Sequence, residues 1–171
     1  MPVDRATPDA GPAEGPDAGR SDRRDGVTGL LAEWLTRAVR QQPAVFAAPG
    51  EPHACSERTH SRLADGRLLC WRPSGPAGLV RAIDAEIVGQ PVPRALARRA
   101  ATDDPNVFWP LWTRAEVRAK LNGIPVVRWL RLVNWPADDD LGDPLDIVTV
   151  VGAGVVLSYG VIPGTLGTSL T

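Results

Sequence analysis

Hydrophobic positions recur at helical spacing early in the chain and form almost continuous apolar runs near its end. In "TGLLAEWLTRAVRQQ" the charged residues fall on the side opposite the apolar ones, which are Leu30, Leu31, Trp34, Leu35, Ala38 and Val39. This periodicity predicts an amphipathic helix that ends before Pro43. We expect the apolar side to pack on the chain's own domain and not on a partner.

The next patterns predict a hairpin and a second helix. In "THSRLADGRLLCWRP" the Ala-Asp-Gly segment is typical of a turn, and residues 68–71 form a short buried strand. In "SGPAGLVRAIDAEIVGQPVP" the side chains of Leu79, Ile83 and Ile87 lie four residues apart, which predicts a helix from Pro76 to Gly89. Residues 92–99 fit either a strand or a helix.

The stretch "AKLNGIPVVRWLRLVNWP", residues 119–136, fits both a helix and a β-hairpin. As a helix, Thr113 and Glu116 form a capping-box pattern ahead of it. As a hairpin, Asn122 and Gly123 supply the two positive-φ positions of a type I′ turn. The limb after the turn is rich in β-branched and aromatic residues, which favours the hairpin. The preceding "TDDPNVFWPLW" is interpreted as a proline-broken aromatic connection packed on the core.

The final apolar stretch, residues 147–162, predicts two buried strands that turn at Gly152-Ala153-Gly154. A membrane anchor is the alternative. The stretch is shorter than about 18 residues, contains several glycines and has no basic residue beyond it, so a membrane attachment is disfavoured.

These elements together predict an α+β fold, with an antiparallel sheet and helices packed on one face. Residues 1–26 contain no aromatic residue and are dense in Pro, Gly, Asp and Arg, so we expect a disordered tail. Residues 27–171 are long enough to form one domain with its own core.

The charge balance excludes a strong overall field. The 19 basic and 20 acidic residues nearly cancel, so neither nucleic acid nor an anionic membrane is an expected partner, although a local basic patch is compatible with this total. Only Lys120 among the basic residues is a lysine, which we interpret first as the bias of a high-GC bacterium. The N-terminus has no apolar signal region, so a cytoplasmic location is the default expectation.

Both histidines and both cysteines of the chain lie within eighteen residues, at His53, Cys55, His60 and Cys70. Two His and two Cys can bind tetrahedral zinc, but the Cys-x2-Cys spacing of common zinc sites is missing. The alternatives are a buried Cys70 with loop histidines, which we favour, and a Cys55–Cys70 disulfide, which a reducing cytoplasm disfavours. The acidic stretch "DDDLGD", residues 138–143, lacks EF-hand spacing and predicts a solvated loop.

A resemblance to a known family emerges from several short motifs in order. The segments "VGQPV" at 88–92, "WTRAEV" at 112–117 and "NGIP" at 122–125 resemble those of the chorismate lyase-like superfamily, which includes chorismate-pyruvate lyases and UTRA-type ligand-sensing domains. The similarity covers about residues 63–136. It implies a protein that binds a small aromatic or cyclohexadienyl carboxylate without a cofactor, with cleavage of that ligand left open.

The resemblance also implies site residues, with departures. The two arginines that grip the carboxylate in the family fall on Ala115 and Leu130, so the neighbouring arginines are the candidates for ligand binding: Arg114, Arg128 and Arg131. Glu116 is the candidate proton donor, because the family's late catalytic Glu has no counterpart here. Trp129 and Trp135 would form walls of the cavity. The other function that the sequence leaves open is non-enzymatic, either a zinc-stabilised interaction module or a catalytically inactive sensor.

Overall fold

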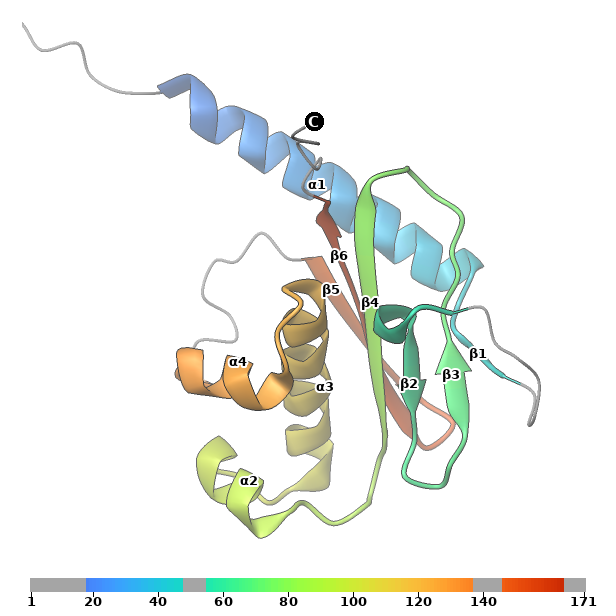
Figure 1. Ribbon diagram of the computed structural model, residues 1–171, viewed down its shortest axis with the longest axis vertical. Helices are drawn as coiled ribbons and strands as arrows, with labels where there is room; N and C mark the ends of the chain where they lie inside the picture. Colours follow the sequence, from blue (N-terminus) through green and yellow to red (C-terminus); the bar gives the residue numbers. More distant parts are fainter. Residues whose placement is uncertain (1–17, 48–54, 137–145, 165–171) are drawn as a thin grey trace, which may run out of the picture.

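The computed structural model describes residues 18–47, 55–136 and 146–164, with side chains from residue 29 onward except that of Asp146 (Figure 1). The chain forms, in order, α1 (Ala18–Gln41), β1 (Val45–Phe46), the 3-10 helix η1 (Glu57–Thr59), β2 (His60–Arg62), β3 (Leu68–Cys70), β4 (Leu79–Ile87), α2 (Arg94–Ala100), α3 (Pro105–Leu121), α4 (Val126–Leu132), β5 (Asp146–Gly152) and β6 (Val155–Pro163). The α+β class predicted from the sequence is confirmed.

The strands form two antiparallel sheets of three strands each, in the orders β1-β3-β2 and β4-β6-β5. The long strand β6 is central in the second sheet and pairs with the whole of β4, from Leu79 opposite Pro163 to Ile87 opposite Val155. A side chain joins the two sheets where β2 lies beside β4. The hydroxyl oxygen of Ser61 accepts a hydrogen bond from the Ala85 amide at 3.0 Å.

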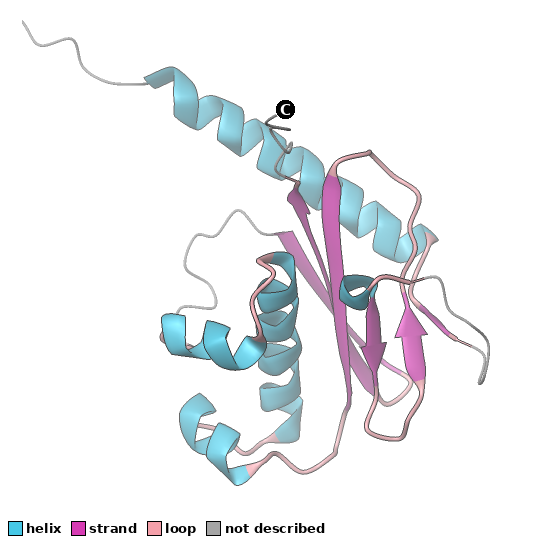
Figure 2. Ribbon diagram, viewed as in Figure 1, coloured by secondary structure: helices cyan, strands magenta, loops and turns pink. Residues whose placement is uncertain are grey.

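Helices cover both faces of the second sheet, contrary to the predicted single face. Ile83 on β4 and Tyr159 on β6 share a core cluster with Leu35 of α1, whereas Ala82 packs with Val117 of α3. Because successive side chains of a strand point to opposite faces, α1 and α3 lie on opposite sides of the sheet. Figure 2 shows α2, α3 and α4 gathered to one side of β4, apart from α1.

The helix predicted from Pro76 to Gly89 is wrong, because this segment contains the strand β4. Its apolar residues lie four positions apart, and four is also a multiple of the two-residue period of a strand. The intervening Ala85 is likewise buried, at 1% exposure. A strand that is buried on both faces can therefore show apolar residues at the same spacing as one face of a helix.

The hairpin predicted for residues 119–136 is also wrong. Asn122 and Gly123 end α3, where the Ile124 amide donates to the Ala119 carbonyl at 2.9 Å and Gly123 has a φ of 66°. This geometry uses Gly123 as a helix stop and not as half of a type I′ turn. Pro125 then precedes α4, which contains the limb that we had assigned to a strand.

The aromatic stretch before it is the first half of α3 and not a connection. Asp104 caps this helix, accepting a hydrogen bond from the Asn106 amide at 2.9 Å, and Pro105 occupies its first turn. The capping box at Thr113 and Glu116 is accordingly wrong, since both residues lie inside the helix. Residues 92–99, left open between two states, contribute to α2.

Three of the predicted elements are confirmed. The first helix ends at Gln41, the hairpin joins β2 to β3, and residues 147–162 form parts of β5 and β6. Helix α1 begins at Ala18, inside the tail predicted to end at residue 26, and residues 1–17 lie outside the described part. None of the helices in the described residues is long and apolar enough to cross a membrane.

Gly160 of β6 permits the close approach of α3 to the sheet. A Cβ atom at this position would collide with Val117 Cγ1 and would lie 2.9 Å from Leu121 Cδ1. Gly160→Ala is expected to lower the free energy of unfolding by about 1–2 kcal/mol, because the branched Val117 side chain cannot rotate away freely. Urea denaturation measures the effect. Gly152→Ala is the matched control, because nothing lies within 4 Å of its added Cβ.

Candidate functional site

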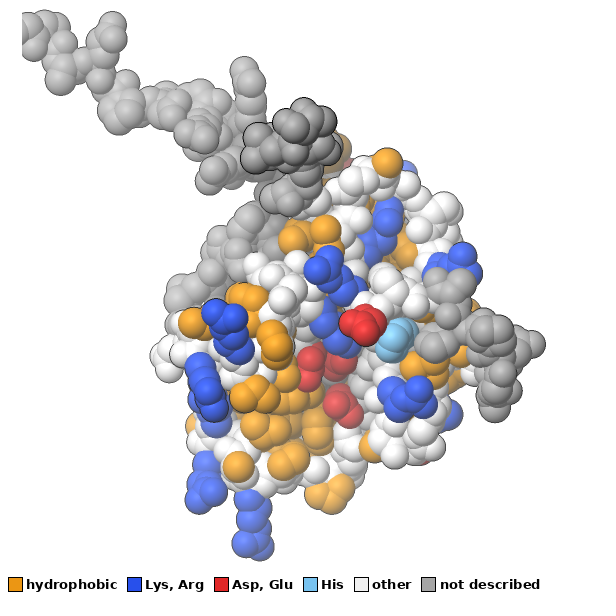
Figure 3. Space-filling view, viewed as in Figure 1, with side chains coloured by type: hydrophobic (Ala, Val, Ile, Leu, Met, Phe, Trp, Pro, Cys, Tyr) orange, Lys and Arg blue, Asp and Glu red, His pale blue; other side chains and the backbone are white. Residues whose placement is uncertain are grey.

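Polar side chains from β4 and α3 meet at the solvent-facing junction of these two elements. Asp84 and Glu86 are two residues apart on β4, so both side chains lie on the face that α3 covers. Glu116 and Lys120 lie one turn apart on α3. We call these four residues the α3–β4 cluster. In Figure 3 Asp and Glu side chains gather near the centre of the visible face, with hydrophobic side chains to their lower left.

Lys120 joins the helix to the strand. Its ammonium donates to the Ile83 carbonyl at 2.8 Å and to Asp84 Oδ1 at 2.9 Å. Asp84 is 6% exposed, and its Oδ2 is buried with no hydrogen-bond partner in the described part of the chain. Burial raises the pKa of the Asp84 carboxyl above its ordinary value, while the charge of Lys120 and the Ser61 hydroxyl act in the opposite direction.

Glu116 changes its protonation state near neutral pH. Burial raises the pKa of its carboxyl to about 7, the negative charges of Asp84 and Glu86 add to the rise, and Lys120 opposes it. Burial also raises the pKa of Glu86, whose Oε2 accepts a hydrogen bond from Gln90 Nε2 at 2.7 Å. A half-buried carboxyl that can gain or lose a proton at neutral pH is suited to acid–base work.

An aromatic cluster borders these polar groups. Trp112 lies one turn before Glu116 on α3, and its side chain acts to lower the pKa of the Glu86 carboxyl, against the rise caused by burial. Its ring stacks on Phe108, with 6.0 Å between centroids, and meets Trp135 edge-on at 6.2 Å. Trp129, predicted to contact a ligand, is half-buried and packs against this aromatic cluster. The aromatic residue placed closest to the α3–β4 cluster is therefore Trp112.

The predicted carboxylate-binding arginines do not gather around Glu116. Arg114 is half-buried on α3, two residues away and therefore on another side of the helix. Arg128 and Arg131 are exposed on α4. The family spacing assumed a hairpin, in which facing strands would bring these arginines to one cavity. The structure instead places Arg114 on α3 and the other two arginines on α4.

Sequence reasoning found Glu116 but missed the other three members of the cluster, Lys120, Asp84 and Glu86. The signals were present. Lys120 is the only lysine beside many arginines, and Asp84 lies between the apolar residues Ile83 and Ala85 of β4. A charged residue in a buried strand predicts a partner of opposite charge, but the partner lies 36 positions away and only the packing of α3 brings it there.

The two cysteines form a disulfide, so the expectation of a buried, unpaired Cys70 is wrong. Cys55 and Cys70 have Cα atoms 6.1 Å apart, within the range that a disulfide spans. His60 lies opposite Cys70 in the β2–β3 ladder, and His53 lies outside the described residues. Paired cysteines offer no thiolate to zinc. Nowhere in the described ranges do three or more His, Cys, Asp or Glu side chains form a group that could hold a metal.

A thiol count tests this pairing. We expect that unfolded, unreduced protein will not react with a thiol reagent and will show two reactive thiols per chain after reduction, because the two sulfurs are bonded to each other. Elemental analysis of the same sample distinguishes the zinc alternative. Two reactive thiols before reduction together with one zinc per chain would contradict the disulfide.

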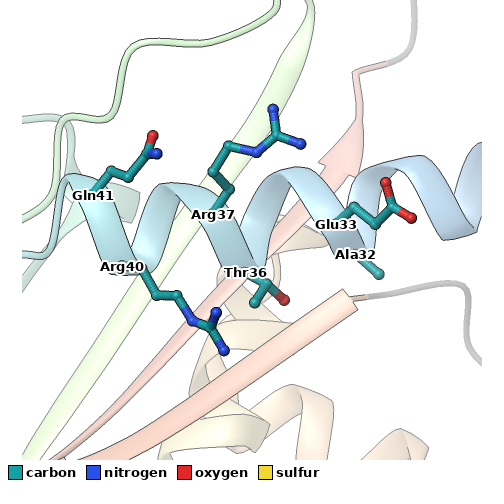
Figure 4. A pocket seen from close by; sticks show the side chains of 6 residues that line it. All are labelled: Ala32, Glu33, Thr36, Arg37, Arg40 and Gln41. Atoms are coloured by element: carbon teal, nitrogen blue, oxygen red, sulfur yellow. The ribbon is translucent and has the colours of Figure 1, made fainter.

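Hollows elsewhere on the surface do not add to this site. One of about 520 Å³ is lined entirely by α1 residues, of which Arg37 and Gln41 point to the opposite side from Thr36 and Arg40 (Figure 4). Another of about 200 Å³ is apolar and lies between β1 and the β5–β6 turn. Neither is lined by a member of the α3–β4 cluster. The acidic stretch at residues 138–143 lies outside the described residues.

No family model, curated protein or solved structure matches this chain. The α3–β4 cluster must therefore be interpreted from its own chemistry.

Proposed function

We propose that this chain binds a small aromatic or cyclohexadienyl carboxylate at the α3–β4 cluster, with Glu116 as the proton donor to it. The ligand class comes from the resemblance to chorismate lyase-like proteins. The observation that supports a site here is the Glu116 carboxyl, whose pKa is raised to about 7 by burial beside charged neighbours. A carboxylic acid that keeps its proton can donate a hydrogen bond to an anionic ligand.

The charges around Glu116 set the conditions for such binding. When Glu116 is protonated, the ammonium of Lys120 offsets Asp84, and the repulsion of an incoming carboxylate is smallest. Lys120 has three N–H donors and uses two of them on Ile83 and Asp84, which leaves one for a ligand. The ring of Trp112 offers an apolar surface to an aromatic ring one helical turn away.

In this proposal the arginines of α4 take no part, and Lys120 replaces them as the cation. If the chain also cleaves chorismate, the bond between the ring carbon and the enolpyruvyl oxygen breaks, and Glu116 supplies the proton that converts the departing enolpyruvate to pyruvate. The neighbouring ring carbon, which bears the hydroxyl, loses its proton as the ring becomes aromatic, and this proton restores the acid form of Glu116. Binding without turnover would identify a sensor of the same ligand class. The zinc-stabilised module receives no comparable support, because Cys55 and Cys70 bond to each other.

Isothermal titration with 4-hydroxybenzoate at several pH values tests the proposal. We expect the affinity to fall as the pH rises through about 7, because ionised Glu116 repels the ligand. Glu116→Gln keeps a neutral donor, so its affinity should no longer depend on pH in this range. Glu33→Gln, an exposed position on α1, is the matched control and should behave like the original chain.

Benzylamine provides the opposite charge for comparison. Tighter binding of this cation as the pH rises, with no binding of 4-hydroxybenzoate at any pH, would contradict the carboxylate class and would show an amine site instead. Chorismate turnover, followed by pyruvate release, then separates an enzyme from a binding protein.

A further inference from the structure

The outward side of α4 combines aliphatic and basic side chains. Val127 and Leu132 are 61% and 63% exposed. Arg128 and Arg131 are exposed beside them. These positions, i, i+1, i+4 and i+5, lie on one side of a helix. The opposite side carries the buried Leu130.

Helix α2 extends this surface with two more arginines. Arg94 and Arg98 are exposed on α2. Arg99 of the same helix donates to the Leu130 carbonyl and, at 3.5 Å, to the Val133 carbonyl, which fixes α2 against the end of α4. We call the combined surface the α2–α4 face; its members are Arg94, Arg98, Val127, Arg128, Arg131 and Leu132. In Figure 3 Lys and Arg side chains follow the left edge of the molecule, with hydrophobic side chains beside them.

The local charge differs from that of the whole chain. Four of the six members of the α2–α4 face are arginines and none is acidic, whereas the full sequence has a net charge of −1. Four aspartates follow within residues 138–143, outside the described residues. Within the described residues, the four arginines of the α2–α4 face have no ion pair. Among the described residues the α2–α4 face is therefore basic, a local patch that the overall composition allows.

We propose that the α2–α4 face docks on an anionic phospholipid surface. The arginines would contact the phosphates of the headgroups, and Val127 and Leu132 would enter the boundary with the acyl chains. This interaction uses both kinds of exposed side chain. It also replaces the expectation, drawn from the total charge, that a membrane is not a partner.

Two other anionic partners fit the surface less well. A single-stranded nucleic acid would stack its bases on aromatic rings, but the exposed apolar side chains here are aliphatic. An acidic peptide needs a groove or a free strand edge, and Val127 and Leu132 project from the convex side of a helix. A flat bilayer meets projecting side chains directly.

Co-sedimentation of the full chain with lipid vesicles tests the proposal. Binding is expected to phosphatidylcholine vesicles that contain phosphatidylserine, to be weak with phosphatidylcholine alone, and to decrease as salt is added. The double variant Arg128→Gln, Arg131→Gln should bind about thirtyfold more weakly, from the loss of two basic residues at the surface. Arg37→Gln, Arg40→Gln on α1 removes the same charge from another surface and should leave binding unchanged.

The aliphatic contribution has its own matched pair. Leu132→Ser should weaken vesicle binding several-fold, whereas Leu30→Ser, 68% exposed on α1, should have no effect. Circular dichroism confirms that each variant is folded. The proposal is overturned by equal losses from both arginine pairs, by no effect of Leu132→Ser, or by equally tight binding to poly-glutamate or to a single-stranded oligonucleotide, since each outcome would reflect charge without lipid.

Discussion

Replacing Lys120 with methionine is expected to lower the free energy of unfolding at pH 7 by about 3–4 kcal/mol. Methionine keeps most of the length of the side chain but removes the ammonium that bonds Asp84 Oδ1 and the Ile83 carbonyl. Asp84 would remain 6% exposed, with its charge uncompensated. We place the effect toward the lower end of the range for a broken buried pair, because the side chain of Lys120 keeps 24% of its surface exposed. Urea denaturation at neutral pH measures the loss.

The double variant Asp84→Asn, Lys120→Met separates the charge from the packing. Removing both charges should restore a large part of the lost stability, since no ion then remains buried alone. The loss in Lys120→Met should also shrink at acid pH, where Asp84 becomes neutral. Equal instability of the single and double variants at all pH values would show that Lys120 stabilises the fold through packing and not through the ion pair.

Glu116→Gln is expected to stabilise the protein at alkaline pH. The pKa of Glu116 is raised from 4.5 to about 7 by folding, so the folded state binds more protons than the unfolded state between these values. The stability of the original chain should therefore decrease as the pH rises from about 4.5 to 7 and then level off. Glutamine cannot ionise. The variant should exceed the original chain by about 2–3 kcal/mol at about pH 8.5 and should match it near pH 4.

Denaturation curves across this pH range provide the test. Glu33→Gln, on the exposed side of α1, should show no such pH-dependent difference. A difference between Glu116→Gln and the original chain that is constant with pH would mean that Glu116 keeps an ordinary pKa. The acid–base role proposed for it would then lose its support.

The sequence predicted correctly those elements whose apolar positions fit either the helical period or the two-residue period of a strand, but not both. The apolar positions 30, 31, 34, 35, 38 and 39 fit only a helix, and "VVGAGVV" places a glycine turn between two β-branched runs. The failures occurred where a pattern fits both periods, as in β4, or where Asn-Gly serves two purposes, as at the end of α3. Local propensity could not resolve either case, because burial against other elements decides them.

For the candidate site, the sequence identified one residue and the packing identified its neighbours. Glu116 followed from a family spacing whose assumed hairpin is wrong, and the arginines predicted by the same spacing lie elsewhere. The predicted ligand walls, Trp129 and Trp135, pack into the aromatic cluster, while Trp112 lies next to Glu116. The disulfide likewise depended on a loop geometry that residue spacing does not encode.

The sequence by itself determined the α+β class, the first helix, the β2–β3 hairpin and the β5–β6 pair, because periodicity and turn chemistry are local properties. Only the tertiary structure decided that α1 and α3 cover opposite faces of the sheet, and that Asp84 meets Lys120 across 36 residues. The same packing buries Glu116, and burial is what moves its pKa to about 7. Burial depends on what the rest of the chain places around a side chain, and no short stretch of sequence contains that information.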